Sequence, residues 1–115
     1  MASNDVHAWI QFKSATFPIA RNGTTSIGRS INSDLRMFED VGVSRDHCVI
    51  SSNDDRLEVA DTSSRNGTRV NGHVIKSPTE LRHHDVIKIG ESELLILLEI
   101  DPDPPGTAGE FTLRT

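Results

Sequence analysis

The sequence predicts an all-β domain, on three observations. Few segments carry the 3.6-residue periodicity of an amphipathic helix, and turn-forming residues recur roughly every eight to twelve positions. The segments between the turns alternate apolar and polar residues, as strands with one buried face do. At 115 residues, with 35% hydrophobic and 25% charged residues, the chain has the size and composition of one soluble domain that buries its core without disulfides or metals.

Short strands are expected throughout the first half of the chain, at residues 9–12, 17–19, 24–27, 35–37 and 47–51. Asn22-Gly23 is predicted to form a hairpin turn between the second and the third of these, because Asn-Gly readily supplies the positive φ that both central positions need. Gly28 closes the third strand. A glycine there lets another backbone or a ligand approach closely, and Arg29 projects beside it.

The second half is expected to continue as strands joined by tight turns. A polar turn at residues 52–55 leads to a strand at 57–60, and Asn71-Gly72 forms a short hairpin turn. Residues 81–89 carry the next strand, at residues 86–89, and the continuously apolar residues 94–98 predict a central strand buried on both faces. The remainder, DPDPPGTAGEFTLRT at residues 101–115, is typical of a Pro/Gly-rich linker or tail, which suggests that the domain belongs to a longer protein.

Composition argues against several classes of partner. The net charge of −5 disfavours direct nucleic-acid binding, since phosphate neutralisation drives such binding. No apolar run is long enough to span a bilayer, and the N-terminus does not resemble a secretory signal. Together with the lone Cys48, which cannot form an internal disulfide, these features predict an intracellular protein without a membrane partner.

Two polar clusters, residues 44–47 and 63–68, flank a short alternating segment and carry the residue types of a phosphate site. A phosphorylated side chain brings about −1.5 to −2 charges and three acceptor oxygens, which suit guanidinium and hydroxyl donors. Arg29, Ser44 and Arg65 are of these types. Asn66 differs, because an amide can both donate to and accept from the main chain of a peptide.

The motifs GRS, SRDHCVI, DTSSRNGTRVNG and LRHHDVIKIG, in this order over residues 10–100, resemble the forkhead-associated (FHA) domain family. Each motif is weak alone, but their joint occurrence at these separations is a strong signal. The resemblance implies an eleven-stranded β-sandwich of two twisted sheets, with loops at one end that bind phosphothreonine peptides. Residues 1–100 would then form the FHA domain, without cofactor or metal.

The resemblance also implies roles for individual residues. Those implied to contact the phosphate are Arg29, Ser44, Arg45 and Arg65, with Arg45 acting through its backbone amide or its side chain. Asn66 is implied to hold the peptide backbone. Those implied to support the loops are Gly28, His47, Gly67 and Thr68. A small pocket for the threonine methyl group would favour phosphothreonine over phosphoserine.

Two positions depart from the family's pattern. His84 stands where the family usually has a glycine before the aspartate of a late turn, and histidine tolerates unusual backbone angles less easily. Gly42 lies two residues before Ser44, at a position that in some members helps to choose the third residue after the phosphothreonine. Without a side chain there, we expect no strong preference for an acidic residue at that ligand position.

We therefore expect a non-enzymatic reader of threonine phosphorylation. By resemblance it would be part of a nuclear signalling or DNA-damage-response protein. The alternative is a self-association module, in which the domain forms a homodimer with or without phosphothreonine in a sister chain's tail. Thr107, Thr112 and Thr115 are the candidate threonines in that tail.

Catalytic and metal-binding readings are weaker. Ser44 and His47 lack a nucleophile-elbow sequence and an orienting acid, as a serine hydrolase would need. A cysteine phosphatase would need an arginine six residues after Cys48, and that residue is Asp54. The adjacent His83-His84 pair would point to opposite faces of a strand and so make a poor chelate.

Overall fold

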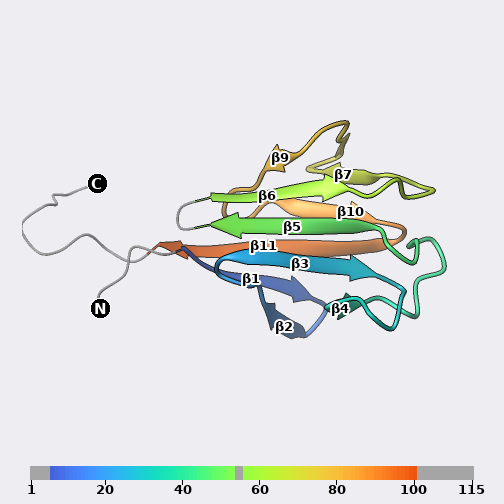
Figure 1. Cartoon of the computed structure of the whole chain (residues 1–115), viewed down its shortest axis with the longest axis horizontal. Coiled ribbons are helices and arrows are strands. Elements are labelled where there is room, and N and C mark those ends of the chain that lie inside the picture. Colours follow the sequence, from blue (N-terminus) through green and yellow to red (C-terminus); the bar gives the residue numbers. More distant parts are fainter. Residues whose placement is uncertain (1–5, 54–55, 101–115) are drawn as a thin grey trace, which may run out of the picture.

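The computed structural model describes residues 6–53 and 56–100 and confirms the all-β class, with eleven strands and no helix in this part of the chain (Figure 1). The predicted tail, residues 101–115, lies outside the described residues. The strands are β1 (Val6–Phe12), β2 (Ala15–Pro18), β3 (Gly23–Gly28), β4 (Leu35–Arg36), β5 (Cys48–Asn53), β6 (Arg56–Asp61), β7 (Thr68–Val70), β8 (His73–Val74), β9 (Thr79–Glu80), β10 (Val86–Ile89) and β11 (Ser92–Ile100).

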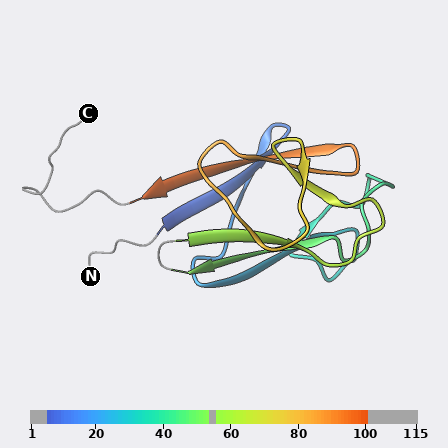
Figure 2. The same ribbon diagram turned by 90° about the horizontal axis from the view of Figure 1, so that it is seen from above.

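The strands form two sheets that pack face to face as a sandwich (Figure 2). The six-stranded sheet has the order β2-β1-β11-β10-β7-β8, and the five-stranded sheet has the order β4-β3-β5-β6-β9. Neighbouring strands are antiparallel except for β3 and β4, which pair in parallel with Gly28 opposite Arg36. The sandwich that the family resemblance implied is therefore present.

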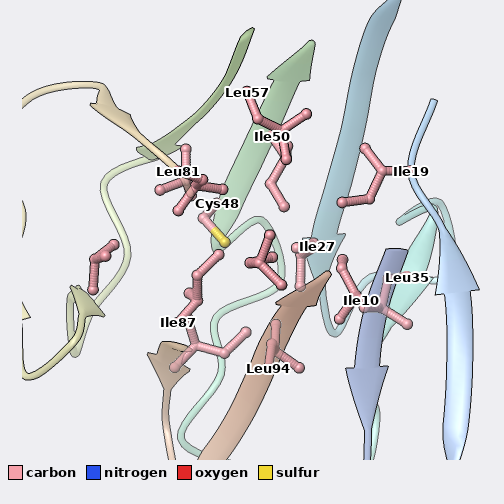
Figure 3. Close-up of a cluster of buried hydrophobic side chains, with 14 of the residues drawn as sticks. Ile10, Ile19, Ile27, Leu35, Cys48, Ile50, Leu57, Leu81, Ile87 and Leu94 are labelled. Atoms are coloured by element: carbon pink, nitrogen blue, oxygen red, sulfur yellow. The ribbon is translucent and has the colours of Figure 1, made fainter. Parts of the chain in front are cut away.

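The core lies between the sheets and is built from alternate residues of facing strands (Figure 3). The fully buried aliphatic residues include Ile10, Ile27, Ile50, Ile87, Ile89, Leu94 and Ile96. Each such side chain contributes about 1.5–3 kcal/mol of transfer free energy when it leaves water. This core fixes the strand ends, and the strand ends carry the loops described below.

The hairpin predicted at Asn22-Gly23 is wrong. β2 and β3 belong to different sheets, so the chain crosses between layers at this point and does not turn back on itself. Gly23 has a φ of 146°, but Asn22 is not among the residues with positive φ. The tight turn lies earlier, where Phe12 pairs with Ala15 and Lys13 takes a φ of 57°. An Asn-Gly pair favours a turn locally, but it does not specify which sheet the next strand joins.

The hairpin predicted at Asn71-Gly72 is confirmed. Val70 pairs with His73 across this turn, and Asn71 and Gly72 have φ values of 52° and 88°. The strand predicted at residues 86–89 is confirmed as well, since β10 has these bounds and the residues just before it form a turn.

β11 holds the predicted central place, since it pairs with β1 on one side and β10 on the other. The expected burial on both faces is wrong. Leu94 and Ile96 are fully buried, but Leu95 and Leu97 on the opposite face are only half-buried. The outer face of this sheet is not covered by another layer of the described chain, and so the strand alternates despite its uniformly apolar sequence.

His84 adopts the left-handed backbone that the family's glycine would supply, with a φ of 73°. Its N–H donates to the Ile96 carbonyl at 2.7 Å, so the turn is kept despite the side chain. The expectation that His83 and His84 point apart is also wrong. They lie in this turn and not in a strand, and their ring centroids are 3.7 Å apart.

We expect stability to decrease from His84→Gly to the wild type and from the wild type to His84→Val. Glycine adopts this φ without crowding from a Cβ atom and should raise the free energy of unfolding by up to about 1 kcal/mol. A β-branched residue at positive φ should lower it by more than about 1 kcal/mol. Urea denaturation measures both, with His83→Gly as a control at negative φ that should not stabilise. Equal stability of the glycine and valine variants would contradict this account of the turn.

Candidate functional site

Three loops meet at the end of the sandwich drawn at the right of Figure 1, where β3 ends, β5 begins, and β6 leads into β7. They enclose a cavity of about 320 Å³. Its lining residues are Arg29, Val41, Gly42, Val43, Ser44, Arg45, Arg65 and Asn66. All five residues implied to touch the ligand therefore lie around one cavity, although Arg29 and Asn66 are far apart in sequence.

A larger groove of about 680 Å³ lies beside this cavity, between the β1–β2 turn and the segment after β4. Its charged residues are mostly acidic, including Glu39, Glu91 and Glu93. Carboxylates repel phosphate, so the smaller, arginine-lined cavity is the better candidate for an anion site.

The buried His47 joins two of the three loops. Its Nδ1 accepts a hydrogen bond from the Ser44 N–H at 2.9 Å, and its Nε2 lies 2.8 Å from the Gly67 carbonyl oxygen. A backbone N–H can only donate and a carbonyl can only accept, so the ring is neutral with its proton on Nε2. His47 thus fixes the distance between the Ser44 loop and the turn that presents Asn66.

Ser44 connects the same loops through its other atoms. Its Oγ accepts a hydrogen bond from the Arg65 N–H at 2.9 Å, and its carbonyl accepts one from the Arg29 N–H at 3.0 Å. Within residues 6–53 and 56–100, the Ser44 hydroxyl has no acceptor for its own proton. That proton is available to a ligand oxygen at the cavity.

Asn66 is held at the cavity edge by one half of its amide. Its Nδ2 donates to the Gly42 carbonyl at 2.9 Å, which ties the β6–β7 loop to the segment before Ser44. The Asn66 Oδ1 accepts no hydrogen bond within the part of the chain described, so it remains free to accept one from a peptide N–H.

Gly28 allows the close approach that its place at the strand end predicted, and the approaching group is backbone. A Cβ atom at Gly28 would lie 2.0 Å from the Arg45 carbonyl oxygen. That same oxygen accepts a hydrogen bond from the Ser30 N–H at 3.1 Å. Contact at this distance brings the loops of Arg29 and Arg45 together, and no side chain larger than hydrogen fits.

Asp61, which is not among the residues predicted from the sequence, organises the β6–β7 loop. Its carboxylate accepts hydrogen bonds from the Ser64 N–H at 2.9 Å, from the Ser64 hydroxyl, and from the buried Thr68 hydroxyl at 2.6 Å. The Ser64 oxygen in turn accepts the Gly67 N–H, where φ is 84°. Burial raises the pKa of Asp61, but the hydrogen bonds from Ser64 and Thr68 outweigh it, so the pKa lies below its usual value.

Asp40 organises the segment before Ser44 through hydrogen bonds in the same way. It accepts hydrogen bonds from the N–H groups of Gly42 and Glu91, both at 2.9 Å, and from the Ser92 hydroxyl at 2.6 Å. Burial raises the pKa of Asp40, and these bonds lower it by more, so the net shift is downward. A Cβ atom at Gly42 would lie 3.0 Å from the Gly90 Cα, so there is little room for a side chain at this position.

The sequence around Asp61 contains a local motif that could have predicted its role in the turn. An aspartate followed by a hydroxyl residue three positions later is a common way to close a turn through side chain to backbone hydrogen bonds. Asp40 also closes a local turn through the Gly42 N–H, but its other two partners, Glu91 and Ser92, lie about fifty residues away in sequence and have no local signal.

Cys48 is buried below the site, and burial, together with the charge of Asp61, raises its pKa to about 12. A thiol with this pKa stays protonated at neutral pH, which counts against a thiolate nucleophile. Among the described residues, no group of three or more His, Cys, Asp or Glu side chains could hold a metal ion. The same residues include no helix long and apolar enough to cross a membrane.

Comparison with known proteins identifies the family. A sequence profile of the FHA domain matches residues 25–90, more than half of the chain, and so the chain belongs to the FHA domain family. It is 41% identical over 73 residues to the human proliferation marker protein Ki-67, covering 64% of this chain and 2% of that protein. It is 42% identical over 74 residues to an oxoglutarate dehydrogenase inhibitor of Corynebacterium jeikeium, covering 64% of this chain and 50% of that protein. The chain thus spans half or less of the length of these relatives.

Solved structures agree with this assignment. An FHA domain studied for phosphothreonine-dependent interactions superposes with a TM-score of 0.75 at 31% identity, covering 81% of this chain and 97% of that one. The FHA domain of FhaA, solved in complex with the intracellular domain of another protein, superposes with a TM-score of 0.71 at 33% identity, covering 77% and 98%. FHA domains are interaction modules, and the family supports phosphopeptide recognition as the general activity.

We expect the domain to lose stability below pH 3.8, the ordinary aspartate value, because Asp40 and Asp61 have lower pKa values in the folded protein. Their contribution is complete above the unfolded pKa and is lost as the pH falls through the folded pKa. Asp61→Asn should reduce the free energy of unfolding at pH 7 and make its decline in acid shallower. Denaturant titrations at several pH values between about 2 and 7 measure both effects. If the free energy of unfolding of Asp61→Asn declined in acid as steeply as that of the wild type, the proposed role of Asp61 in the loop would be contradicted.

Proposed function

We propose that this domain binds phosphothreonine-containing segments of partner proteins at the arginine-lined cavity, without catalysing a reaction on them. The observation that carries the proposal is the lining itself. Arg29, Arg45 and Arg65 surround a cavity that no carboxylate lines, in a chain whose net charge is −5. Concentrating positive charge in this way suits a single small anion far better than a general surface role.

The phosphate would accept hydrogen bonds from groups that the fold leaves unpaired. The Ser44 hydroxyl proton and the Arg45 backbone N–H have no acceptor among the described residues. The Arg29 and Arg65 backbone N–H groups are already used within the loops, so these two residues would contribute their guanidinium groups. Paired guanidinium N–H donors match phosphate oxygens well.

Asn66 would hold the peptide main chain beside the phosphate, using the Oδ1 atom and the N–H that its bond to Gly42 does not occupy. Support comes from a neighbour in which such a peptide is present. The FHA domain of MEK1, solved in complex with a phosphothreonine peptide of HOP1, superposes with a TM-score of 0.69 at 25% identity, covering 84% of this chain and 98% of that one.

A preference for threonine over serine would come from apolar surface at the cavity. Val41 lines the cavity with an exposed side chain that can pack against a methyl group, whereas the other lining valine, Val43, is buried. Burial of one methyl group is worth about 0.8 kcal/mol, or roughly a fourfold difference in affinity. We include this preference in the proposal.

The cellular setting is the wider part of the proposal. Intracellular placement goes with a ligand made by protein kinases. Nuclear placement and a role in signalling or the DNA damage response stay predictions from the family resemblance. The relatives include bacterial as well as human proteins, so membership of the family does not by itself imply a nuclear protein.

Self-association is a second candidate, favoured by one observation. Trp9, Leu95 and Leu97 are only half-buried on the outer face of the six-stranded sheet, where Trp9 pairs with Leu97. A second copy of the domain could cover these residues. Sedimentation of the unphosphorylated domain separates the two candidates, because a stable dimer without phosphate would favour self-association.

We expect Arg29→Ala to weaken binding of a phosphothreonine peptide by at least about tenfold, because a charge-assisted contact to phosphate is lost. The matched control is Arg56→Ala, which removes the same charge at the start of β6, at the other end of the sandwich. Isothermal titration calorimetry with phosphothreonine, phosphoserine and unmodified versions of peptides selected from an oriented library measures the effect. Equal binding of the phosphothreonine peptide by Arg29→Ala and Arg56→Ala, or release of phosphate by the wild type, would contradict the proposal.

A further inference from the structure

A second cavity of about 490 Å³ adjoins the first and is lined by Arg29, Ser30, Ile31, Arg36 and Arg45. Arg29 and Arg45 line both cavities, so together they form a shared wall. Arg36 lines the second cavity and not the first, and it also lines the larger groove that contains Glu39 and Asp40. The cationic surface therefore extends beyond the space that one phosphate group would fill.

Arg36 reaches this place through the short parallel pairing of β4 with β3. Gly28 lies opposite Arg36 in the register, so the residue after Gly28 is brought beside it. Leu35 and Met37 on either side are buried, which anchors the strand and leaves Arg36 on the exposed face. Residues 35–37 have the sequence of an ordinary strand, and nothing local in them points to the site.

Two contacts hold the Arg36 side chain in position. Its Nε donates to the Arg29 carbonyl at 3.3 Å, and its guanidinium carbon lies 5.4 Å from the centroid of the Phe38 ring. A cation above an aromatic ring gains electrostatic stabilisation, and the hydrogen bond fixes the rotation of the group. The other N–H groups of Arg36 have no acceptor within the described part of the chain. An ordered guanidinium with free donors is suited to an anion.

The charge around this cavity is uncompensated. Three arginines line it and no carboxylate does, and none of the three forms an ion pair with any residue that the structure describes. The acidic residues closest to these arginines in sequence are Asp34 and Asp46, and neither lines the cavity. The Asp34 carboxylate accepts hydrogen bonds from the N–H and hydroxyl of Ser26. Like charges held together are unfavourable until an anion is bound.

We propose that the ligand carries a second anionic group, a phosphate or a carboxylate, which Arg36 binds together with Arg29 and Arg45. This inference rests on the proposed function, because the second group is placed relative to the phosphothreonine. An extended peptide advances about 3.3 Å per residue, so adjoining cavities correspond to positions within about three residues of each other. Arg36 is then a specificity-determining residue that selects ligands with a neighbouring negative charge.

The test uses a phosphothreonine peptide selected for binding and three sets of derivatives. The first set adds a second phosphorylated residue at each position up to three before or after the phosphothreonine, and the second adds aspartate or glutamate at the same positions. The third adds the same charge at the end of a longer peptide, as a control for general attraction. Affinities are measured for the wild type, Arg36→Gln, Arg36→Lys and the control Arg56→Gln, all checked for folding by thermal denaturation.

A second charge at one of the near positions should strengthen binding to the wild type by about fivefold or more, and less at high salt. Arg36→Gln should lose this gain and still bind the singly phosphorylated peptide, while Arg56→Gln should keep it and Arg36→Lys should keep part of it. Whichever set shows the gain that depends on Arg36 identifies the second group as phosphate or carboxylate.

An equal gain in wild type and Arg36→Gln, or no gain at any near position, would overturn the inference. If the singly phosphorylated peptide still bound in a way that depended on Arg29, the proposed function would stand without it. Failure of every phosphothreonine peptide to bind would overturn both.

Discussion

The candidate site depends on one buried imidazole. His47 makes four hydrogen bonds that converge from different parts of the chain. Its ring links the Ser44 N–H to the Gly67 carbonyl, its own N–H donates to the Ile27 carbonyl, and its carbonyl accepts from the Thr62 N–H. Each bond connects the start of β5 to a neighbouring strand or loop, and the ring is inaccessible to solvent. A polar group buried with all its partners satisfied rigidifies its surroundings, because any displacement leaves donors or acceptors unpaired in a low dielectric.

Around this residue the domain separates its charges by function. The carboxylates of Asp40 and Asp61 turn toward backbone N–H groups and hydroxyls, where they stabilise loops. The guanidinium groups of the site form no ion pairs within the described chain and line the cavities. An acidic protein can therefore present a cationic surface at one end, since the carboxylates of Asp40 and Asp61 are hydrogen-bonded within the loops and do not line the two arginine-lined cavities.

The sequence predicted what depends on local pattern or on a complete motif. The all-β class followed from alternation and turn spacing, the Asn71-Gly72 hairpin from turn chemistry, and the meeting of Arg29 with Ser44 and Asn66 from the family resemblance. Predictions from the sequence failed where tertiary structure decides how a segment pairs or whether a face is covered. Asn22-Gly23 has a hairpin signature but connects two sheets, and Leu95 is apolar but lies on an uncovered face. Arg36 and Asp40 were missed because their partners come from strand pairing and from residues distant in sequence.

The central claim is that a phosphothreonine ligand occupies the end of the sandwich that His47 holds together. The most direct measurement is a titration of the ¹⁵N-labelled domain with a phosphothreonine peptide and its unmodified counterpart, followed by amide chemical shifts. The account predicts that shift changes with the phosphopeptide concentrate at Arg29, Ser44, Arg45, Arg65 and Asn66, and that the unmodified peptide causes almost none. Changes centred on Trp9 and Leu95, or equal changes with both peptides, would contradict it.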